Sequence, residues 1–269
     1  MSDKRSPIGI FDSGLGGLTS LKAVKSLLPN EDIIYFGDTA RVPYGDRSKE
    51  TIIEYVKDDI NFLLTHKVKA IVIACNTADS MAKAEMNEIY KLPILGVVSP
   101  ASEVAAKTTK NNKIGVIGTK ATIKSGSYER HIKKSNPKAE VFSVACPLLV
   151  PLVEDGRITL KDSVTREVLT DYLAPLKEKN VDTLVLGCTH YPLLSDLITD
   201  IFPEAVQISS GAAAANVLKE TLISQNLLND KKEKGNISYF VSDNVSGFSE
   251  NGGMFIGEKI TDSVRLYSF

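Results

Sequence analysis

The sequence predicts an α/β protein made of two similar domains, each a mainly parallel sheet flanked by helices, with the active site in the cleft between them. Short β-branched runs alternate along the chain with longer amphipathic segments, which is typical of α/β folds. These runs are continuously apolar, as expected for strands that are covered on both faces. Two of them lead directly into a cysteine, Cys75 or Cys188, which indicates that one α/β unit occurs twice.

The apolar runs define the expected strands, and the amphipathic segments define the clearest helices. The helices are expected over 18–28, 49–67 and 163–179. In the second of these, the apolar residues at 52, 53, 56, 60, 63 and 64 form one stripe with a period of 3.6 residues. In chain order, the expected strands are IGIF (8–11), DIIYFG (32–37), AIVIA (70–74), ILGVV (94–98), KIGVIG (113–118), AEVFSVA (139–145), TLVLG (183–187), AVQIS (205–209) and ISYFVS (237–242).

The two cysteine units also suggest where the domains divide. Each cysteine is preceded by a long helical segment, a turn containing basic residues and a strand. We expect the first domain to comprise residues 1–98 plus 209–269 and to carry Cys75. The second domain is expected to comprise residues 99–208 and to carry Cys188, so the helix-rich stretch after Ser209 would return to the first domain.

Composition and charge exclude several classes of protein. The chain has 269 residues, of which 43% are hydrophobic and 24% charged, so it can bury a substantial core. Its formal net charge of −1 gives no electrostatic reason to expect nucleic acid or an anionic membrane as a partner. No apolar run approaches the roughly 18–20 residues that a spanning helix needs. The start, MSDKRSPIGIF, has no apolar signal-peptide segment, so a cytoplasmic location is expected.

The three cysteines do not suggest a disulfide framework or a zinc ribbon, because their number is odd and no CxxC occurs. Cys146 stands before Pro147 without polar neighbours and is interpreted as structural. Cys75 and Cys188 each follow a strand and precede polar residues, in CNT and CTH. We expect a helix to begin after each of these two and to lower the pKa of its thiol.

Two further polar clusters follow strands, where ligands bind in open α/β sheets. FDSGLGG (11–17) places Asp12 and Ser13 before glycines that are expected to turn the chain tightly and to present N–H groups to a carboxylate or phosphate. FGDTARVPYG (36–45) carries Asp38, Tyr44 and Gly45 in a long loop. The alternatives are a plain βα turn and an ordinary surface loop. The glycine spacing of FDSGLGG is not that of a nucleotide-binding motif.

Four chemistries fit these side chains. A Cys–His pair with an acid suits a nucleophilic hydrolase or amidase. Cys75, Cys188, His190 and Asp12 could bind zinc. Two thiols could form a redox disulfide. The fourth is proton transfer at carbon, in which thiols on opposite walls take a proton from one face of a planar species and return one to the other.

The same runs carry a family resemblance. GIFDSGLGGLT, YFGDTARVPYG, ACNTA, GVIGT, CPLLVPLVE and GCTHYPLL stand in this order over nearly the whole chain. In these runs the chain resembles the bacterial glutamate racemases, of the cofactor-independent aspartate/glutamate racemase superfamily. The resemblance implies an enzyme that interconverts L- and D-glutamate without pyridoxal phosphate or metal. It also implies a supply of D-glutamate for peptidoglycan and a homodimer.

The resemblance further implies roles for individual residues. Cys75 would handle the proton of the D-isomer and Cys188 that of the L-isomer. Asp12 and His190 would assist the thiols. Asp38 and Glu154 match further acidic positions tied to catalysis in the family. The positions that would contact substrate are Asp12, Ser13, Tyr44, Gly45, Asn76, Thr77, Thr119, Thr122, Thr189 and His190.

Two positions depart from the family pattern, which has proline at 46 and a small residue at 79. Here they are Asp46 and Asp79. A carboxylate at 79 would oppose a Cys75 thiolate if it faced inward, and so would change the rate and the pH profile. Two other functions stay open: a racemase for another amino acid such as aspartate, and a non-catalytic protein that binds a metal or an anion through Cys75, Cys188 and His190.

Overall fold

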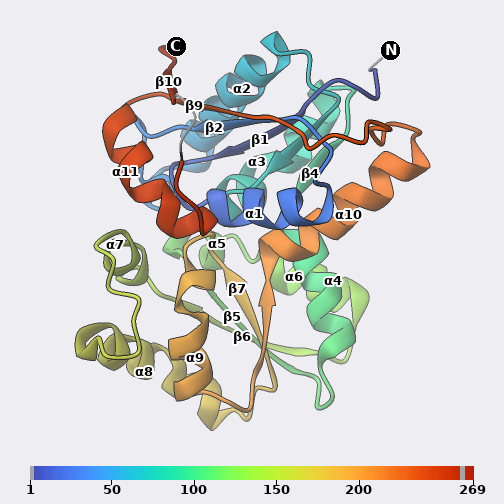
Figure 1. Ribbon diagram of the computed structural model, residues 1–269. Coiled ribbons are helices and arrows are strands. Elements are labelled where there is room, and N and C mark those ends of the chain that lie inside the picture. Colours follow the sequence, from blue (N-terminus) through green and yellow to red (C-terminus); the bar gives the residue numbers. More distant parts are fainter. Residues whose placement is uncertain (1–2, 261–263) are drawn as a thin grey trace.

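The computed structural model describes residues 3–260 and 264–269, and it contains two parallel sheets placed one above the other (Figure 1). The six-stranded sheet has the order β10-β9-β2-β1-β3-β4, and the four-stranded sheet has the order β6-β5-β7-β8. All pairings within the sheets are parallel. The predicted fold class, parallel sheets flanked by helices, is confirmed.

The strands match the predicted apolar runs closely. Their bounds are β1 Ile8–Asp12, β2 Ile33–Gly37, β3 Ala70–Ile73, β4 Ile94–Gly96, β5 Lys113–Gly118, β6 Glu140–Ala145, β7 Thr183–Gly187, β8 Val206–Ser209, β9 Ile237–Val241 and β10 Arg265–Leu266. All nine predicted strands are present, with ends that differ by no more than two residues. The sequence did not predict β10, because its two residues are both exposed and show no apolar pattern.

The three predicted helices are present and end one or two residues early. One reason is visible after α2, where Lys67 takes a positive φ of 55°, which a helix cannot continue through. The helices are α1 Leu18–Leu27, α2 Lys49–Thr65, α3 Asn76–Ile89, α4 Val98–Thr108, α5 Lys120–Lys124, α6 Ser127–Ser135, α7 Leu149–Glu154, α8 Ser163–Glu178, α9 Ser195–Ile201, α10 Ser210–Ser224 and α11 Val245–Ile256, with the 3₁₀ helices η1 Tyr44–Asp46 and η2 Tyr191–Leu194.

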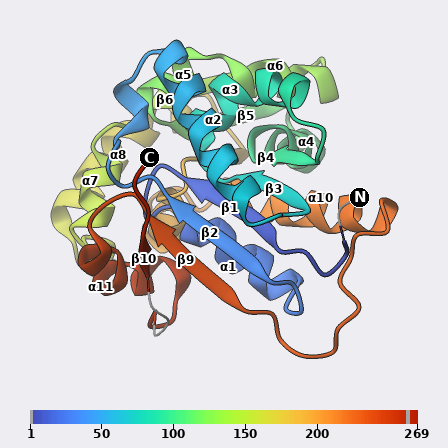
Figure 2. The ribbon, with the colours of Figure 1, turned by 90° about the horizontal axis from the view of Figure 1, so that it is seen from above.

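Strand β1 shows why the runs are continuously apolar. Ile10 packs in a cluster with Leu18 and Leu21 of α1, whereas the next residue, Phe11, packs in a second cluster with Val56 and Ile60 of α2. The two helices lie on opposite faces of the sheet (Figure 2). Since successive strand residues point to opposite faces, both must be apolar, and alternation is lost.

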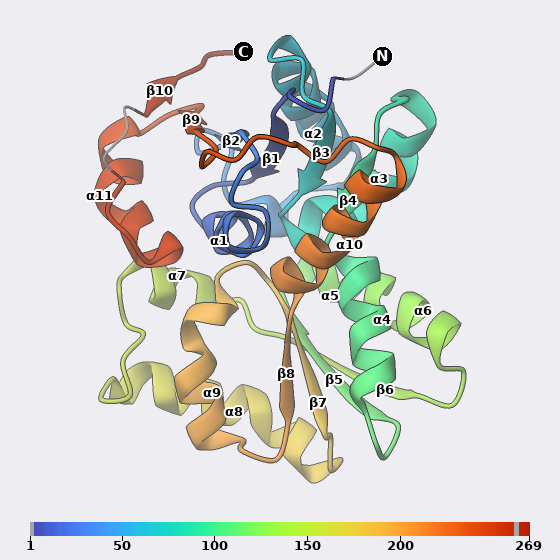
Figure 3. The ribbon, with the colours of Figure 1, turned by 45° about the vertical axis from the view of Figure 1, so that its right-hand side comes forward.

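The sheets draw on different parts of the chain. The strands of the six-stranded sheet lie within residues 8–96 and 237–266, and those of the four-stranded sheet within residues 113–209. Between the sheets, α10 packs against both α1 and α4 (Figure 3). The division of the chain into domains at residues 98 and 209 stays a prediction. In the described residues, no helix has the length and apolar character needed to cross a membrane.

Candidate active site

A cavity of about 300 Å³ lies where the carboxyl ends of strands from both sheets face each other. Ser13 follows β1 and Cys75 follows β3, whereas Thr119 follows β5 and Cys188 follows β7. Most of the residues predicted for the site line this cavity: Ser13, Tyr44, Gly45, Cys75, Asn76, Thr77, Thr119, Glu154, Cys188, Thr189 and His190. Asp12, Asp38 and Thr122 do not line it.

Cys75 and Cys188 reach the cavity from the two sheets, and each side chain is almost buried, with 6% of its surface exposed. All three cysteines are free thiols. Cys146 does not line the cavity. It packs in the apolar core and its Sγ donates to the carbonyl of Val144 at 3.6 Å, in keeping with the structural role expected for it.

The environment of Cys75 corrects the predicted pKa. The helix α3 does begin directly after this residue. Nevertheless, burial, followed by the nearby Asp12 carboxylate, raises the pKa of Cys75 to about 12. Hydrogen bonds from the Ala78 N–H and to Ser13 Oγ, the latter at 3.8 Å, act in the opposite direction. The expectation of a lowered pKa is wrong because desolvation of the thiolate outweighs the favourable helix terminus.

Cys188 has a different environment. His190 Nδ1 lies 3.8 Å from Cys188 Sγ, and His190 Nε2 lies 3.0 Å from Glu154 Oε1. Burial lowers the pKa of His190, but its hydrogen bonds to Cys188 and Glu154 raise it, and the result is about 10. The imidazole is therefore a cation at neutral pH, placed between the sulfur of Cys188 and the carboxylate of Glu154.

The helix expected directly after Cys188 is absent. The chain instead forms the short 3₁₀ helix η2 from Tyr191, and α9 begins only at Ser195. Pro192 stands in the first turn of η2 and supplies no backbone N–H. At this thiol, a charged imidazole takes the place of the helix N-terminus that we expected.

Asp12 lies beneath the cavity wall and is fully buried. Its carboxylate accepts hydrogen bonds from Gly14 N at 2.9 Å and Thr189 Oγ1 at 3.4 Å, so it joins the β1 loop to the loop after β7. Burial raises the pKa of Asp12, although the nearby His190 cation opposes this shift. The carboxylate thus acts on both thiol environments without lining the cavity itself.

The glycines of DSGLGG stand in the turn between β1 and α1, as expected, and two of them are also needed for close packing. None of the three has a positive φ. A Cβ built on Gly16 would lie 2.2 Å from Thr189 Oγ1 and 2.5 Å from His190 Nδ1, and one on Gly17 would lie 2.3 Å from Asp12 Cβ. Glycine is needed at 16 because any side chain there would displace His190 or Thr189 of the facing loop, and at 17 because a side chain there would displace Asp12.

Hydroxyl and amide groups link the two sides of the cavity. Thr77 Oγ1 of α3 lies 3.0 Å from Thr119 Oγ1, which follows β5, and 3.2 Å from Thr122 Oγ1. Asn76 Nδ2 donates to Ser210 Oγ at 3.2 Å. Thr122 is buried behind this cluster, so it orients the two lining threonines rather than facing the cavity.

Asp38 belongs to a buried network behind the cavity wall. It accepts hydrogen bonds from Tyr44 Oη at 2.5 Å, Arg41 Nε at 2.6 Å and Ser242 Oγ at 2.8 Å. Tyr44 lines the cavity, but its hydroxyl points away from it and toward the carboxylates of Asp38 and Asp59. Asp38 therefore reaches the cavity through Tyr44.

The sequence analysis missed Asp59, the second carboxylate of this network. Asp59 is fully buried on α2, with Oδ2 3.1 Å from Tyr44 Oη and Oδ1 3.1 Å from Arg41 Nη2. Burial and then the Asp38 carboxylate raise the pKa of Asp59 well above its ordinary value. A signal was present, because position 59 stands between 56 and 63 on the buried face of the helix, where a charged residue needs a partner.

The two departures from the family pattern lie in different places. Asp46 is exposed and lines the cavity beside Gly45. Asp79 is turned away from Cys75: its Oδ2 accepts a hydrogen bond from Val98 N, the first residue of α4, at 2.6 Å. The inward-facing carboxylate considered above is therefore not what the structure contains.

Some lining residues had no individual role in the sequence analysis. They are Gly14, Val42, Pro43, Asp46, Lys120, Pro147, Val150 and Pro151. The last three belong to the run CPLLVPLVE, whose apolar side chains resemble a core segment in sequence. Within residues 3–260 and 264–269, no group of three or more His, Cys, Asp or Glu side chains has an arrangement that could hold a metal ion.

Comparisons with known proteins agree on one family. Residues 21–218 match the family model described as Asp/Glu/Hydantoin racemase. The chain is 46% identical over 260 residues to a glutamate racemase from Geobacter metallireducens, which covers 96% of each chain. It is also 46% identical over 259 residues to a glutamate racemase from Chlorobaculum tepidum, covering 96% of this chain and 94% of that one.

Solved structures give the same result. A glutamate racemase from Bacillus anthracis has a TM-score of 0.93 and 37% identity, covering 99% of this chain and 98% of that chain. One from Francisella tularensis, solved with D-glutamate, has a TM-score of 0.90, 38% identity and the same coverage. An aspartate racemase from Picrophilus torridus has a TM-score of 0.58 and 19% identity, and this similarity shows only a shared fold. The chain belongs to the aspartate/glutamate/hydantoin racemase family.

Proposed function

We propose that this protein is a glutamate racemase, an isomerase that interconverts L- and D-glutamate by moving the α-proton between two thiols. The observation that carries this proposal is that Cys75 and Cys188, from corresponding strand ends of two parallel sheets, line one cavity. The near full-length similarity to glutamate racemases supports glutamate as the substrate.

The reaction needs one thiolate and one thiol. The thiolate takes the α-proton from one face of the substrate and becomes a thiol, leaving a planar, carbanion-like species. The second thiol gives its proton to the opposite face and becomes the thiolate, so the enzyme carries the same number of protons before and after turnover. In the assignment that the resemblance implies, Cys188 takes the proton of L-glutamate and Cys75 that of D-glutamate.

The two thiols have different helpers. The His190 cation, held by Glu154, lies beside Cys188 and offsets the negative charge that this sulfur carries whenever it acts as the base. Cys75 instead has the Asp12 carboxylate nearby, and burial followed by that carboxylate raises the pKa of its thiol. We infer that Asp12 influences both sides of the site through its buried charge, since it lies near Cys75 and accepts a hydrogen bond from Thr189, beside Cys188.

The remaining site residues suit an amino acid with two carboxylates and an ammonium group. Four residues with hydroxyl groups line the cavity, namely Ser13, Thr77, Thr119 and Thr189, and Asn76 begins α3, whose N-terminus favours an anion. Buried polar groups of this kind replace the water that the charged substrate loses on binding. We assign Asp38 and Thr122 an indirect role, through Tyr44 and through Thr77 with Thr119.

The biological role follows from the product, since D-glutamate is a building block of peptidoglycan. We propose that the protein supplies it in the cytoplasm, with glutamate as its small-molecule partner and no nucleic acid or membrane partner. We further propose a homodimer, supported by the family resemblance. Sedimentation velocity would measure this directly, and a monomer at micromolar concentration would contradict it.

Proton exchange tests the function most directly. The purified protein, without pyridoxal phosphate and with a chelator, is incubated in D₂O with L- or D-glutamate and followed by NMR. We expect the α-proton signal to disappear from both, with the opposite enantiomer appearing in each. The variants C75A and C188A should each abolish racemisation, because one acid/base group is then missing. Absence of exchange from either enantiomer, with exchange from aspartate, would refute glutamate as the substrate.

A further inference from the structure

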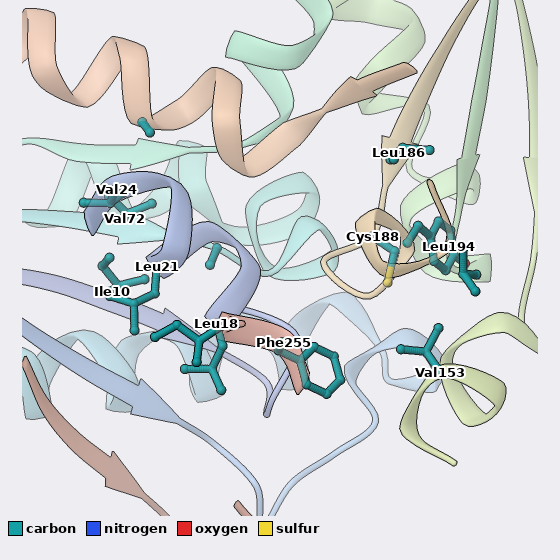
Figure 4. Packing of buried hydrophobic residues seen from close by; sticks show 14 of the residues in the cluster. Ile10, Leu18, Leu21, Val24, Val72, Val153, Leu186, Cys188, Leu194 and Phe255 are labelled. Carbon is teal, nitrogen blue, oxygen red and sulfur yellow. The ribbon is translucent and has the colours of Figure 1, made fainter. Parts of the chain in front are cut away.

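His190 has an aromatic neighbour that no catalytic scheme above has used. Phe255, on α11, packs at right angles to the imidazole, with ring centroids 5.2 Å apart and planes inclined by 87°. The Phe255 side chain is buried, with 2% of its surface exposed. Figure 4 shows it between Leu18 of α1 and Val153 of α7, in the cluster that also contains Cys188.

The other neighbours of His190 contact its two ring nitrogens but do not cover the face of the imidazole ring. Nδ1 faces Cys188 and Nε2 faces Glu154. The backbone at Gly16 stands so close to Nδ1 that no Cβ would fit. Because Glu154 is about half exposed, it cannot by itself shield the imidazole from water. Phe255 supplies an apolar contact that offers no competing hydrogen bond.

We propose that Phe255 is a positioning residue for the reaction: its ring holds His190 in line with Cys188 and keeps water from the imidazole. This inference rests on the proposed function. The contact links separate parts of the chain, because α11 packs against α1 beside the six-stranded sheet, whereas His190 follows β7 of the other sheet. The proton transfer at Cys188 depends on this contact, whereas the transfer at Cys75 does not.

The same helix provides a matched control. Phe248 is also on α11 and is buried to a similar extent, but its ring packs against Tyr35 and Tyr239. Phe248→Leu therefore removes a comparable aromatic side chain from the same helix without touching His190. Phe255→Tyr keeps the aromatic ring beside the imidazole and tests whether ring contact is sufficient.

The experiment measures primary deuterium isotope effects on kcat/KM from each enantiomer, using glutamate deuterated at Cα. The ratio of kcat/KM in the two directions is fixed by the equilibrium constant, so rates alone cannot locate a defect. If Phe255→Leu slows proton transfer at Cys188, the isotope effect measured with L-glutamate as substrate increases, because that step breaks the C–D bond of this isomer. The isotope effect measured with D-glutamate decreases, because Cys75 breaks the C–D bond of that isomer and this step then limits the rate less than the slowed step at Cys188. Since small misplacements can cost about 100-fold in rate, we expect kcat to fall by about tenfold or more.

A second measurement does not depend on turnover. Solvent exchange of the imidazole N–H protons of His190 is followed by NMR, with H190Q used to assign the signals. We expect exchange about tenfold faster in Phe255→Leu, because the local structure that shields the ring opens more often, and unchanged in Phe248→Leu and Phe255→Tyr.

The outcomes separate this inference from the proposed function. If the unmodified protein does not racemise glutamate, the proposed function fails and the positioning role fails with it. If the unmodified protein is active but Phe255→Leu changes neither isotope effect, changes both in the same direction, or behaves like Phe248→Leu, only the role of Phe255 is refuted. Opposite changes confined to Phe255→Leu, with faster imidazole exchange, support it.

Discussion

At the scale of single residues, the two thiols are chemically unequal although they occupy corresponding positions. Cys75 has a buried carboxylate nearby, and its pKa is raised to about 12. Cys188 instead faces an imidazole whose own pKa is raised to about 10. A racemase must use both thiols in both directions, so this difference has to be offset by the substrate's own charges once it fills the cavity. We infer that the substrate ammonium group, together with the N-terminus of α3, supplies positive charge near Cys75.

The raised pKa of His190 predicts a dependence of stability on pH. Its native pKa of about 10 lies above the ordinary value of 6.5, so its stabilising effect is complete below pH 6.5 and lost as the pH rises through 10. Between these values the unfolded chain has lost the proton that the native protein keeps. The free energy of unfolding should therefore fall as the pH rises, by at most about 1.4 kcal/mol per pH unit.

Urea unfolding between pH 6.5 and 8.5 would measure this slope. This range lies below the ordinary cysteine pKa of 9.0, so the cysteines of the unfolded chain stay mostly protonated throughout it. We expect His190→Gln to remove most of the slope. His131→Gln, on α6 and outside the cavity lining, is the matched control and should retain it. An unchanged slope in His190→Gln would show that the imidazole is not held protonated.

At the scale of secondary structure elements, the joint between α3, β4 and α4 depends on one carboxylate. Asp79 of α3 accepts the Val98 N–H at the start of α4, where helix N–H groups have no partner within the helix. Gly96 makes room for it, since a Cβ at that position would lie 2.0 Å from Asp79 Oδ1. This contact fixes the place where the chain leaves the six-stranded sheet.

Asp79→Ala should therefore destabilise the fold more than it affects the chemistry at Cys75. We expect a loss of about 1–3 kcal/mol in the free energy of unfolding, because the buried N–H groups of α4 lose their acceptor. Asp79→Asn, which keeps an acceptor oxygen, should lose less. Urea unfolding measures both, and Glu88→Ala at an exposed position of α3 is the control. If Asp79→Ala and Glu88→Ala are equally stable, the capping role is wrong.

At the scale of the whole molecule, the cavity is shared between the two sheets. Its walls come from loops after β1, β2 and β3 on one side and after β5, β6 and β7 on the other. A substrate that contacts both sides adds a further link between the parts of the protein that carry the two sheets. Binding energy then adds to the stability of the whole fold.

Glutamate should accordingly stabilise the protein against unfolding as a single unit. At a concentration about 100 times the dissociation constant, D-glutamate is expected to add about 2.7 kcal/mol to the free energy of unfolding. Calorimetry should show one transition shifted to higher temperature. D-glutamine, which lacks the second carboxylate, is the control and should shift it less at the same concentration. Equal shifts would mean that the cavity does not recognise the side-chain carboxylate.

The sequence by itself determined the strands, the fold class and most of the cavity lining. Continuous apolar runs are local signals for strands covered on both faces, and the polar residues that follow them must gather at one edge of a parallel sheet. For this reason Ser13, Cys75 and Cys188 could be predicted together, whereas Thr119 was expected only from the family resemblance. The buried Asp59 was also signalled, by a charge on the apolar face of α2.

Only the tertiary structure decided the rest. The pKa of Cys75, the direction in which Asp79 faces, the indirect position of Asp38 and the contact between Phe255 and His190 all depend on which distant segments pack together. Burial and electrostatic shifts depend on three-dimensional neighbours, and the same local motif gives opposite pKa shifts in exposed and buried surroundings. Local patterns therefore determine which residues reach the site, whereas long-range packing determines the charge that each one carries there.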